Sequence, residues 1–215
     1  MKDILKLGFA LMIYGLIAGI SLGYINSITK PIIDAQEKAA KETAIKEVLP
    51  DTVAIVNLTY TNAAGDEVEY SVGYSDAEKT NATGYAVTAN GNGFSSIIKT
   101  IVGLDTAFNI NKIAVVYQNE TPGLGTRCVE EGFKSQFVGK AGRTVAVDKD
   151  GGDIVAITGA TITSRAVAAS IKDIVSDIEN NIPKTLKSDS TEDTLEIGAN
   201  ADEDIAGGGE DVKLQ

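Results

Sequence analysis

The sequence predicts an α+β protein with an N-terminal transmembrane helix, a helical stalk, a domain built on a twisted sheet and an acidic tail. Three observations support this fold class. An uncharged run of 19 residues lies near the N-terminus, short segments rich in Val, Ile, Thr and Tyr follow it, and acidic residues accumulate after Pro183. The predicted anchor, stalk, sheet domain and tail occupy residues 1–26, 27–50, 51–184 and 185–215.

The apolar run from Leu7 to Ile25 is long enough to cross a bilayer. At about 1.5 Å per residue, a helix of this length spans roughly the 30 Å hydrocarbon core. A cleaved signal peptide is the alternative, but its apolar region usually has about 7–15 residues and ends at a small-residue cleavage site. Here the run continues into INSITKPII without such a site, which favours a retained single-pass anchor. Lysines flank the run on both sides, so the positive-inside rule does not decide its orientation.

A second helix is predicted just beyond the anchor. Ile28, Ile32, Ala35 and Ala39 recur at helical spacing. Pro31 suits the first turn of a helix, because the N–H group that proline lacks would have no partner there. The helical pattern ends before the next proline, which makes this segment a stalk above the membrane surface.

Between residues 51 and 184 the pattern becomes strand-like. Glycine-containing turn signals at 64–66 and 91–93 separate runs rich in β-branched and aromatic residues. Two helices are predicted in the same part of the chain, at about Val129–Val138 and from Ser164 to Asn180. The predicted strands are Thr52–Tyr60, Glu67–Gly73, Gly84–Ala89, Ser95–Val102, Lys112–Gln118, Thr144–Asp148 and Asp153–Thr158.

The composition excludes several classes of function. Acidic residues outnumber basic residues 30 to 19, and this net charge of −11 argues against binding to nucleic acid. The chain has no histidine, which removes the common catalytic triads and the ordinary zinc sites. Its single cysteine, Cys128, allows neither an internal disulfide nor a cysteine-ligated iron–sulfur cluster. We therefore expect no metal site, and any redox chemistry requires an organic cofactor.

The acidic excess is concentrated in the last part of the chain. Residues 185–215 contain nine acidic residues, two lysines, three consecutive glycines and no aromatic residue. A segment of this composition has too little apolar surface to fold, so it is predicted to be a solvated, disordered tail. Binding of a basic partner or of cations is the alternative role.

The first motif that indicates chemistry is TGATITS, at 158–164, which precedes the last predicted helix. A helix N-terminus presents unpaired N–H groups and a partial positive charge, so it favours an anion such as phosphate. Gly159 and Ala160 are small enough for a ligand to approach the backbone. The alternative is a hydroxyl-rich turn in which Thr163 or Ser164 only caps the helix.

The second motif is ETPGLGT, at 120–126, which follows a predicted strand. Pro122 and Gly123 suit the two central positions of a type II turn. Two glycines would allow the backbone to lie flat against a ligand. The motif matches neither a Walker loop nor a dinucleotide-binding fingerprint, and an exposed surface loop is the alternative.

Several motifs occur in a fixed order along residues 1–182, and together with the anchor they resemble one family. The chain is similar to the RnfG/NqrC type of membrane-anchored flavoprotein subunit, and its size is more like RnfG. The motifs are Asn26-x-x-Thr29-Lys30-Pro31, Val48-Leu49-Pro50, Val102-Gly103-Leu104-Asp105, ETPGLGT, Gln136-Phe137-x-Gly139-Lys140 and TGATITS.

The resemblance implies a covalently bound FMN and a site for it. In this family a hydroxyl of the TGAT motif carries FMN through a phosphoester bond formed by a separate flavin transferase, and the matching residue is Thr161. The phosphate would rest on the first turn of the last helix with Arg165 as a counter-charge, and ETPGLGT would cover part of the ring. The expected FMN-binding residues are Glu120, Thr121, Pro122, Gly123, Leu124, Gly125, Thr158, Gly159, Ala160, Thr161, Ile162, Thr163, Ser164 and Arg165.

Two positions depart from the family pattern. Val155 stands where relatives often have an acid, and the nearest carboxylate, Asp153, is displaced by two residues. If the flavin transferase recognises that acid, its displacement would make flavin attachment less efficient. Gln118 stands where many relatives have histidine, and no imidazole is therefore needed here for proton transfer.

The function implied by the resemblance is electron transfer within a membrane complex. The complex would couple electron flow between ferredoxin and NAD to translocation of Na+ or H+, as an oxidoreductase of the translocase class. This chain would contribute no complete active site. The partners would be other subunits, including a second flavin-carrying membrane subunit, and the FMN domain would face outside the cytoplasm of a bacterial or archaeal cell.

Three other functions remain open from the sequence. The chain could be the equivalent subunit of a sodium-pumping NADH:quinone oxidoreductase, of the NqrC type. It could also be a non-redox, membrane-anchored binding module that has lost the flavin. A eukaryotic cell-surface protein is the third, because the sequons at Asn57, Asn81 and Asn119 match the glycosylation pattern, which occurs often by chance.

Overall fold

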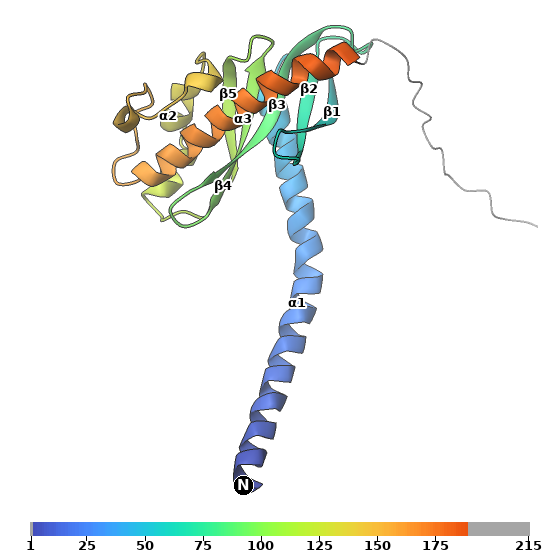
Figure 1. The fold of residues 1–215 in the computed structure, drawn as a ribbon, viewed down its shortest axis with the longest axis vertical. Helices are drawn as coiled ribbons and strands as arrows, with labels where there is room; N and C mark the ends of the chain where they lie inside the picture. Colours follow the sequence, from blue (N-terminus) through green and yellow to red (C-terminus); the bar gives the residue numbers. More distant parts are fainter. Residues whose placement is uncertain (1, 189–215) are drawn as a thin grey trace, which may run out of the picture.

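One long helix carries an antiparallel sheet, and a second helix crosses that sheet (Figure 1). The computed structural model describes residues 2–188, so the predicted tail lies outside the described residues from 189 onward. The long elements are α1 (Lys2–Val48), β1 (Ala54–Thr61), β2 (Glu67–Tyr74), β3 (Ala82–Asn92), β4 (Ile97–Asp105), β5 (Ile110–Tyr117) and α3 (Thr161–Ser188).

Helix α1 runs without interruption from the predicted anchor through the predicted stalk. Pro31 lies inside it, so the prediction that a second helix begins near this proline is wrong. Proline removes one backbone hydrogen bond from a helix interior, but the helical residues on both sides continue past it. Among the described residues, α1 is the one helix long and apolar enough to cross a membrane, with a mean hydropathy of 1.8 in its most apolar window.

The five strands form one open sheet in sequence order, and each strand is antiparallel to its neighbours. Val102 of β4 lies opposite Val87 of β3 on one side and Ile113 of β5 on the other. The first five predicted strands are confirmed with boundaries shifted by a few residues. At 91–92, β3 continues into residues that were predicted to form a turn.

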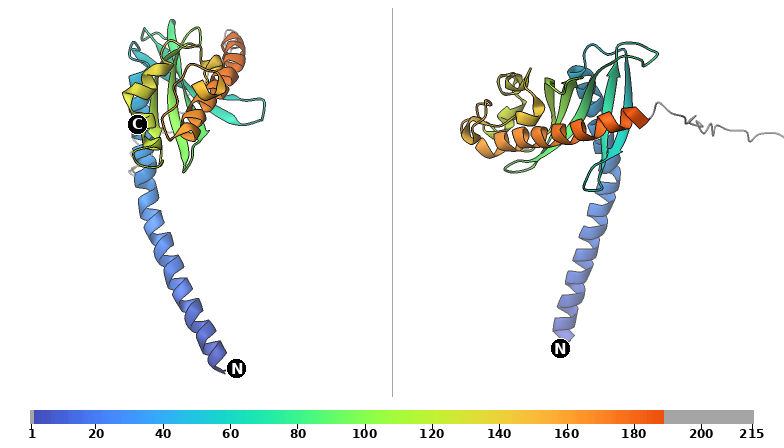
Figure 2. Two further views of the ribbon diagram at one scale, coloured as in Figure 1. Left: turned by 90° about the vertical axis from the view of Figure 1, so that its left-hand side faces the viewer. Right: turned by 45° about the horizontal axis from the view of Figure 1, so that its top comes forward.

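Each face of the sheet is covered by a different helix (Figure 2). Alternate residues of a strand point to opposite faces, so β4 contributes to two cores. The larger core contains Val102 and the buried side of α3, including Val167, Ile171 and Val175. The smaller core contains Ile101 and the last turns of α1; its members are Ala44, Ile45, Val48, Leu49, Ala86, Ile101 and Ala114. Each fully buried aliphatic side chain stabilises the fold by about 1.5–3 kcal/mol.

Ion pairs show in which direction α1 passes the sheet. Glu37 pairs with Lys99, near the β3–β4 turn, over 2.8 Å. Ten residues later Glu47 pairs with Lys112, near the opposite end of the sheet, over 3.0 Å. These exposed pairs contribute little stability, but they show which end of the sheet each part of α1 contacts. The β3–β4 turn and the residues that follow β5 therefore lie at the end of the sheet nearer the N-terminal part of α1 (Figure 1).

The segment between β5 and α3 differs from its prediction. The single helix expected at 129–138 is three short pieces, η1 (Gly125–Val129), α2 (Glu131–Lys134) and η2 (Ser135–Phe137), because Glu130 adopts an extended conformation between the first two.

The strands predicted at 144–148 and 153–158 are also wrong. These two stretches meet only at an isolated bridge between Val147 and Ile154. Two short helical turns, η3 (Gly142–Thr144) and η4 (Asp148–Asp150), lie in this segment. The turn η4 reverses the chain so tightly that the two stretches form one bridge and not an extended ladder. Side chains bind the backbone there instead.

Candidate functional site

The two motifs singled out from the sequence meet at one hollow of about 420 Å³. The β3–β4 turn, the ETPGLGT loop and the start of α3 supply its walls. Its volume lies within the roughly 300–1,000 Å³ typical of small-molecule sites. The lining residues are Phe94, Glu120, Thr121, Leu124, Gly125, Gly159, Ala160, Thr161, Ile162 and Thr163.

Most of the predicted site residues line this hollow, and five do not. Pro122 and Gly123 form the outer part of their turn, Ser164 is fully buried behind the helix start, and Thr158 lines a neighbouring hollow together with Arg127. The fifth is Arg165. Phe94 lines the hollow although the sequence analysis did not select it.

The start of α3 presents a backbone suited to an anion. Gly159 has a φ of +80°, a left-handed conformation that favours glycine. The N–H of Ala160 donates to the carbonyl of Ile157, and the N–H of Ser164 donates to the carbonyl of Ala160. The N–H groups of residues 161–163 therefore precede the helical hydrogen-bond ladder, and no acceptor binds them within the described residues. Such groups together with the helix dipole attract phosphate.

The three hydroxyls at the start of α3 have different environments. Thr163 is 1% exposed and donates its hydroxyl to a carboxylate oxygen of Glu120 over 2.6 Å. Ser164 accepts the N–H of Ile157 and donates to the carbonyl of Ala160. Thr161 is half-buried at the hollow, and its hydroxyl has no partner among the described residues. Thr161 therefore supplies the hydroxyl that is open to a ligand.

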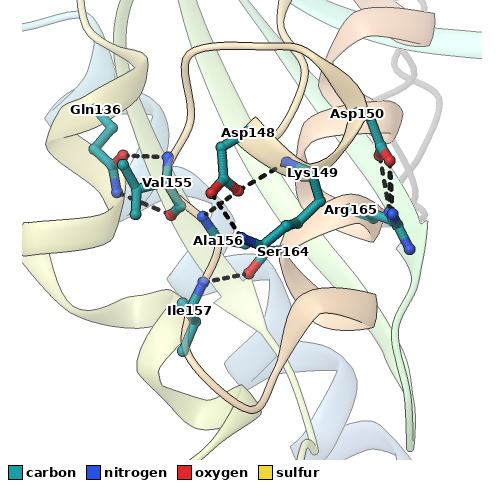
Figure 3. A network of polar contacts seen from close by, with 9 residues as sticks. All are labelled: Gln136, Asp148, Lys149, Asp150, Val155, Ala156, Ile157, Ser164 and Arg165. Atoms are coloured by element: carbon teal, nitrogen blue, oxygen red, sulfur yellow. Dashed lines mark hydrogen bonds and ion pairs between the residues drawn. The ribbon is translucent and has the colours of Figure 1, made fainter.

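Side chains hold the segment that leads into TGATITS in place of a sheet ladder (Figure 3). The Gln136 amide accepts the N–H of Val155 over 2.7 Å and donates to the carbonyl of the same residue. Asp148 accepts the N–H of Ala156, and Ser164 accepts the N–H of Ile157. The Val155 side chain projects into solvent, 62% exposed.

Arg165 binds a carboxylate rather than lining the hollow. Its guanidinium donates to both carboxylate oxygens of Asp150, with distances of 2.6–3.0 Å (Figure 3). The pair lowers the pKa of Asp150 below its ordinary value, mainly through the hydrogen bond from Arg165. The bond joins the turn at 148–150 to the first turns of α3, so in this structure Asp150 is the direct counter-charge of Arg165.

The ETPGLGT loop begins with the type II turn that its sequence predicts. The N–H of Leu124 donates to the carbonyl of Thr121 over 3.1 Å, and Gly123 has a φ of +75°. A Cβ on Gly123 would meet nothing within 4 Å, so this glycine is required by backbone conformation alone. A Cβ on Gly125 would lie 2.7 Å from the Cβ of Glu120, so that glycine is required by close packing.

Glu120 is a buried carboxylate at the base of the hollow, 4% exposed. It accepts the backbone N–H groups of Phe94, Ser95 and Ser96 over 2.9–3.0 Å and the hydroxyl of Thr163. Burial alone would raise the pKa of Glu120, but these hydrogen bonds outweigh it, and the pKa lies below its ordinary value. The residue is therefore ionised at neutral pH.

Apolar side chains surround the mouth of the hollow. Phe94 is 69% exposed, and Leu124 and Ile162 are also exposed. They come from the three different walls. An aromatic residue directly after the glycines at 91 and 93 is the sequence signal that could have indicated Phe94. These surfaces suit a planar apolar ring better than water.

The arrangement fits a flavin mononucleotide. A phosphate matches the open N–H groups of residues 161–163, and a ring matches the apolar mouth. Within residues 2–188, no group of three or more His, Cys, Asp or Glu side chains could hold a metal ion.

The part of the chain that contains the hollow matches a known domain family. The family profile described as an FMN-binding domain matches residues 93–176, which include every residue that lines the hollow. The G subunit of the ion-translocating oxidoreductase complex of Erwinia tasmaniensis is 32% identical over 78% of this chain and 86% of its own length. The G subunit of the Na+-translocating ferredoxin:NAD+ oxidoreductase complex of Acetobacterium woodii is 29% identical over 79% of this chain and 89% of its own length.

A solved structure has a related fold. It is the C subunit of the Na+-translocating NADH-quinone reductase of Parabacteroides distasonis, with a TM-score of 0.50 and 20% identity. The superposition covers 68% of this chain and 94% of that chain. At this identity the likeness concerns the fold alone.

Proposed function

The chain belongs to the family of G subunits of ion-translocating oxidoreductase complexes, and from this premise we propose that it is an electron-transfer subunit with FMN bound covalently to Thr161. The complex would exchange electrons between ferredoxin and NAD and translocate Na+ or H+. The observation that carries the proposal is the hollow in which an open threonine hydroxyl, a helix N-terminus and an apolar mouth converge.

The attachment would use groups that the chain presents in one place. The Oγ1 of Thr161 would bond to the flavin phosphate, and the N–H groups of residues 161–163 would neutralise part of the phosphate charge. A covalent link prevents loss of a cofactor that non-covalent contacts alone would release at finite affinity. A separate flavin transferase would form the bond, as the family resemblance implies.

The protein would control the orientation and exposure of the ring. When bound, the isoalloxazine supplies the electron-carrying chemistry. Leu124 and Ile162 would exclude water from the faces of the ring. Phe94 would cover the ring on the side where the β3–β4 turn lies. Glu120 lies at the base of the hollow as a fixed negative charge.

The apolar part of α1 and the family support membrane attachment. The uncharged part of α1 would anchor the chain in the bilayer, and the rest would hold the domain outside the cytoplasm. The partners would be other subunits of the complex, including a second flavin-carrying membrane subunit. The nicotinamide and ferredoxin sites would belong to those partners. The G-subunit relatives favour this assignment over the NqrC-type alternative, for which the likeness is one of fold.

Replacement of Thr161 tests the proposal. The full chain, co-expressed with a flavin transferase, should gain the mass of one FMN less one water and fluoresce in a denaturing gel. Thr161→Val keeps the side-chain volume but removes the oxygen, so both signals should disappear. Thr59→Val is the matched control and should retain them, because Thr59 is exposed on β1 and does not line the hollow.

Two results would contradict the proposal. Flavin on the Thr161→Val protein would place the attachment elsewhere. A wild-type chain without flavin, despite an active transferase, would favour the non-redox binding module.

A further inference from the structure

We infer that Glu120 and Thr163 form a clamp that positions the hydroxyl of Thr161 for flavin attachment. The inference rests on the proposed function, and it assigns positioning roles to two residues that do not themselves bond to the phosphate. The Thr163 hydroxyl donates to Glu120 across 43 positions of sequence, over 2.6 Å. Both side chains are buried.

The clamp joins all three walls of the hollow. One carboxylate oxygen of Glu120 accepts the N–H groups of Ser95 and Ser96, and the other accepts the N–H of Phe94 and the hydroxyl of Thr163. Consecutive backbone N–H groups that converge in this way form an anion-binding nest. Here the anion is a side chain of the protein, so the β3–β4 turn and α3 are both bound to the ETPGLGT loop.

Two glycines show that close packing around the carboxylate is built into the sequence. A Cβ on Gly93 would lie 2.6 Å from one carboxylate oxygen of Glu120. A Cβ on Gly125 would lie 2.9 Å from the other oxygen and 2.9 Å from the Oγ1 of Thr163. Either side chain would displace the carboxylate. Gln118 adds a further restraint, because its side chain accepts the backbone N–H of Glu120 over 2.9 Å.

The geometry of a helix transmits the clamp to Thr161. Thr163 follows Thr161 by two residues in the first turn of α3, and both residues line the hollow. The hydrogen bond from Thr163 to Glu120 therefore restrains the backbone that carries Thr161. If the hydrogen bond were lost, the first turn of α3 would be free to fray or rotate, because helix ends are the least restrained part of a helix.

The step affected is a substitution at phosphorus. The Oγ1 of Thr161 forms the new P–O bond, and the hydroxyl proton goes to solvent or to the transferase. The P–O bond between the flavin phosphate and the leaving group of the flavin-nucleotide donor breaks, and the leaving group departs with the electron pair of that bond. No electrons are gained or lost. Misplacement of a reacting group by about 1 Å costs about 100-fold in rate, so loss of the clamp should lower the rate of attachment more than it changes the docking of the transferase.

The test compares isosteric variants of the full chain with a defined flavin transferase. Thr163→Val removes the hydroxyl at nearly constant volume, and Thr163→Ser restores it. Glu120→Gln keeps the shape but replaces an acceptor with a donor. Glu130→Gln is the matched control, because Glu130 is exposed and pairs with Arg127 on the surface. Melting temperature and amide exchange of Ser95 and Ser96 are measured on the flavin-free proteins.

For Thr163→Val and Glu120→Gln we expect the kcat of attachment to fall by about tenfold or more, with the KM for the flavin acceptor chain changed by less than about twofold. Thr163→Ser should recover most of the rate, and Glu130→Gln should match the wild type. The amides of Ser95 and Ser96 should exchange faster in Glu120→Gln, because they lose a charged acceptor.

Three results would overturn the inference. The first is a lowered melting temperature with an unchanged kcat, which would make the contact purely structural. The second is failure of Thr163→Ser to recover the rate. The third is a wild-type chain that is never labelled at Thr161, which would overturn the proposed function and this inference with it.

Discussion

Alanine at Gly125 should damage the site far more than alanine at Gly123, although both glycines belong to the same loop. A Cβ on Gly125 would lie 2.7 Å from the Cβ of Glu120 and 2.9 Å from the Oγ1 of Thr163. Neither atom can move away cheaply, since both side chains are buried and hydrogen-bonded. Overpacking of this kind costs about 1–3 kcal/mol. Weakened hydrogen bonds to the charged carboxylate place the expected loss at the upper end, at about 3 kcal/mol.

Gly123→Ala adds a methyl group to open space but requires an L-residue at a φ of +75°. That conformation costs about 1–2 kcal/mol.

Thermal unfolding of the detergent-solubilised full chain checks the comparison. In a protein of this size about 1 kcal/mol shifts the melting temperature by roughly 2–4 °C. We therefore expect a loss of about 6–12 °C for Gly125→Ala and about 2–8 °C for Gly123→Ala. Flavin attachment should survive only in Gly123→Ala. If Gly123→Ala is at least as destabilised as Gly125→Ala, or loses its flavin while Gly125→Ala keeps it, the packing argument around Glu120 is wrong.

Two further predictions follow from ionisation. The hydrogen bonds that lower the pKa of Glu120 contribute stability above about pH 4.5, and this contribution is lost as the pH falls through the pKa of the folded state. In urea titrations the difference in unfolding free energy between wild type and Glu120→Gln should therefore shrink on acidification below about pH 4.5; a constant difference would contradict the assignment. Burial, with a smaller effect of Glu120, raises the pKa of Cys128 to about 11. At pH 8 a thiol reagent should react with Cys128 more than about 100-fold faster in urea-unfolded protein than in folded protein, because the thiolate is the reactive form and the folded thiol is inaccessible; comparable rates would contradict its burial.

The local sequence pattern predicted the elements whose apolar residues recur at regular spacing. It failed where contacts between distant parts of the chain determine the local structure. The five sheet strands and the last helix were predictable from their spacing. Val147 and Ile154 have the composition of strand residues, but they meet at a single bridge because the chain between them is too tightly turned. Gly91 was assigned to a turn because glycine is common there. It lies instead in β3, where a Cβ would be 2.4 Å from the carbonyl oxygen of Ala166, so its role is the close approach of α3.

The candidate site was predictable in part for the same reason. The TGATITS and ETPGLGT motifs identified two walls of the hollow, because turn chemistry and a helix start are local signals. The β3–β4 turn, with Phe94, carries no local signal of equal strength. The partnership of Glu120 with Thr163 depends on a contact that only the folded chain brings together.

Because α1 is unbroken, its length sets both the distance of the hollow from the apolar N-terminal segment and the direction in which the hollow faces. Glu37, which meets the sheet at Lys99, comes twelve residues after Ile25, or about 18 Å along a helix. The connection therefore behaves like a screw: each added residue lifts the domain by about 1.5 Å and turns it by about 100°. Seven added residues would lift it by about 10 Å and restore nearly the same facing, whereas two would point the hollow almost the opposite way. In the proposed complex, with the apolar part of α1 held among neighbouring subunits, the number of residues in a segment far from the hollow would decide which neighbour the hollow faces.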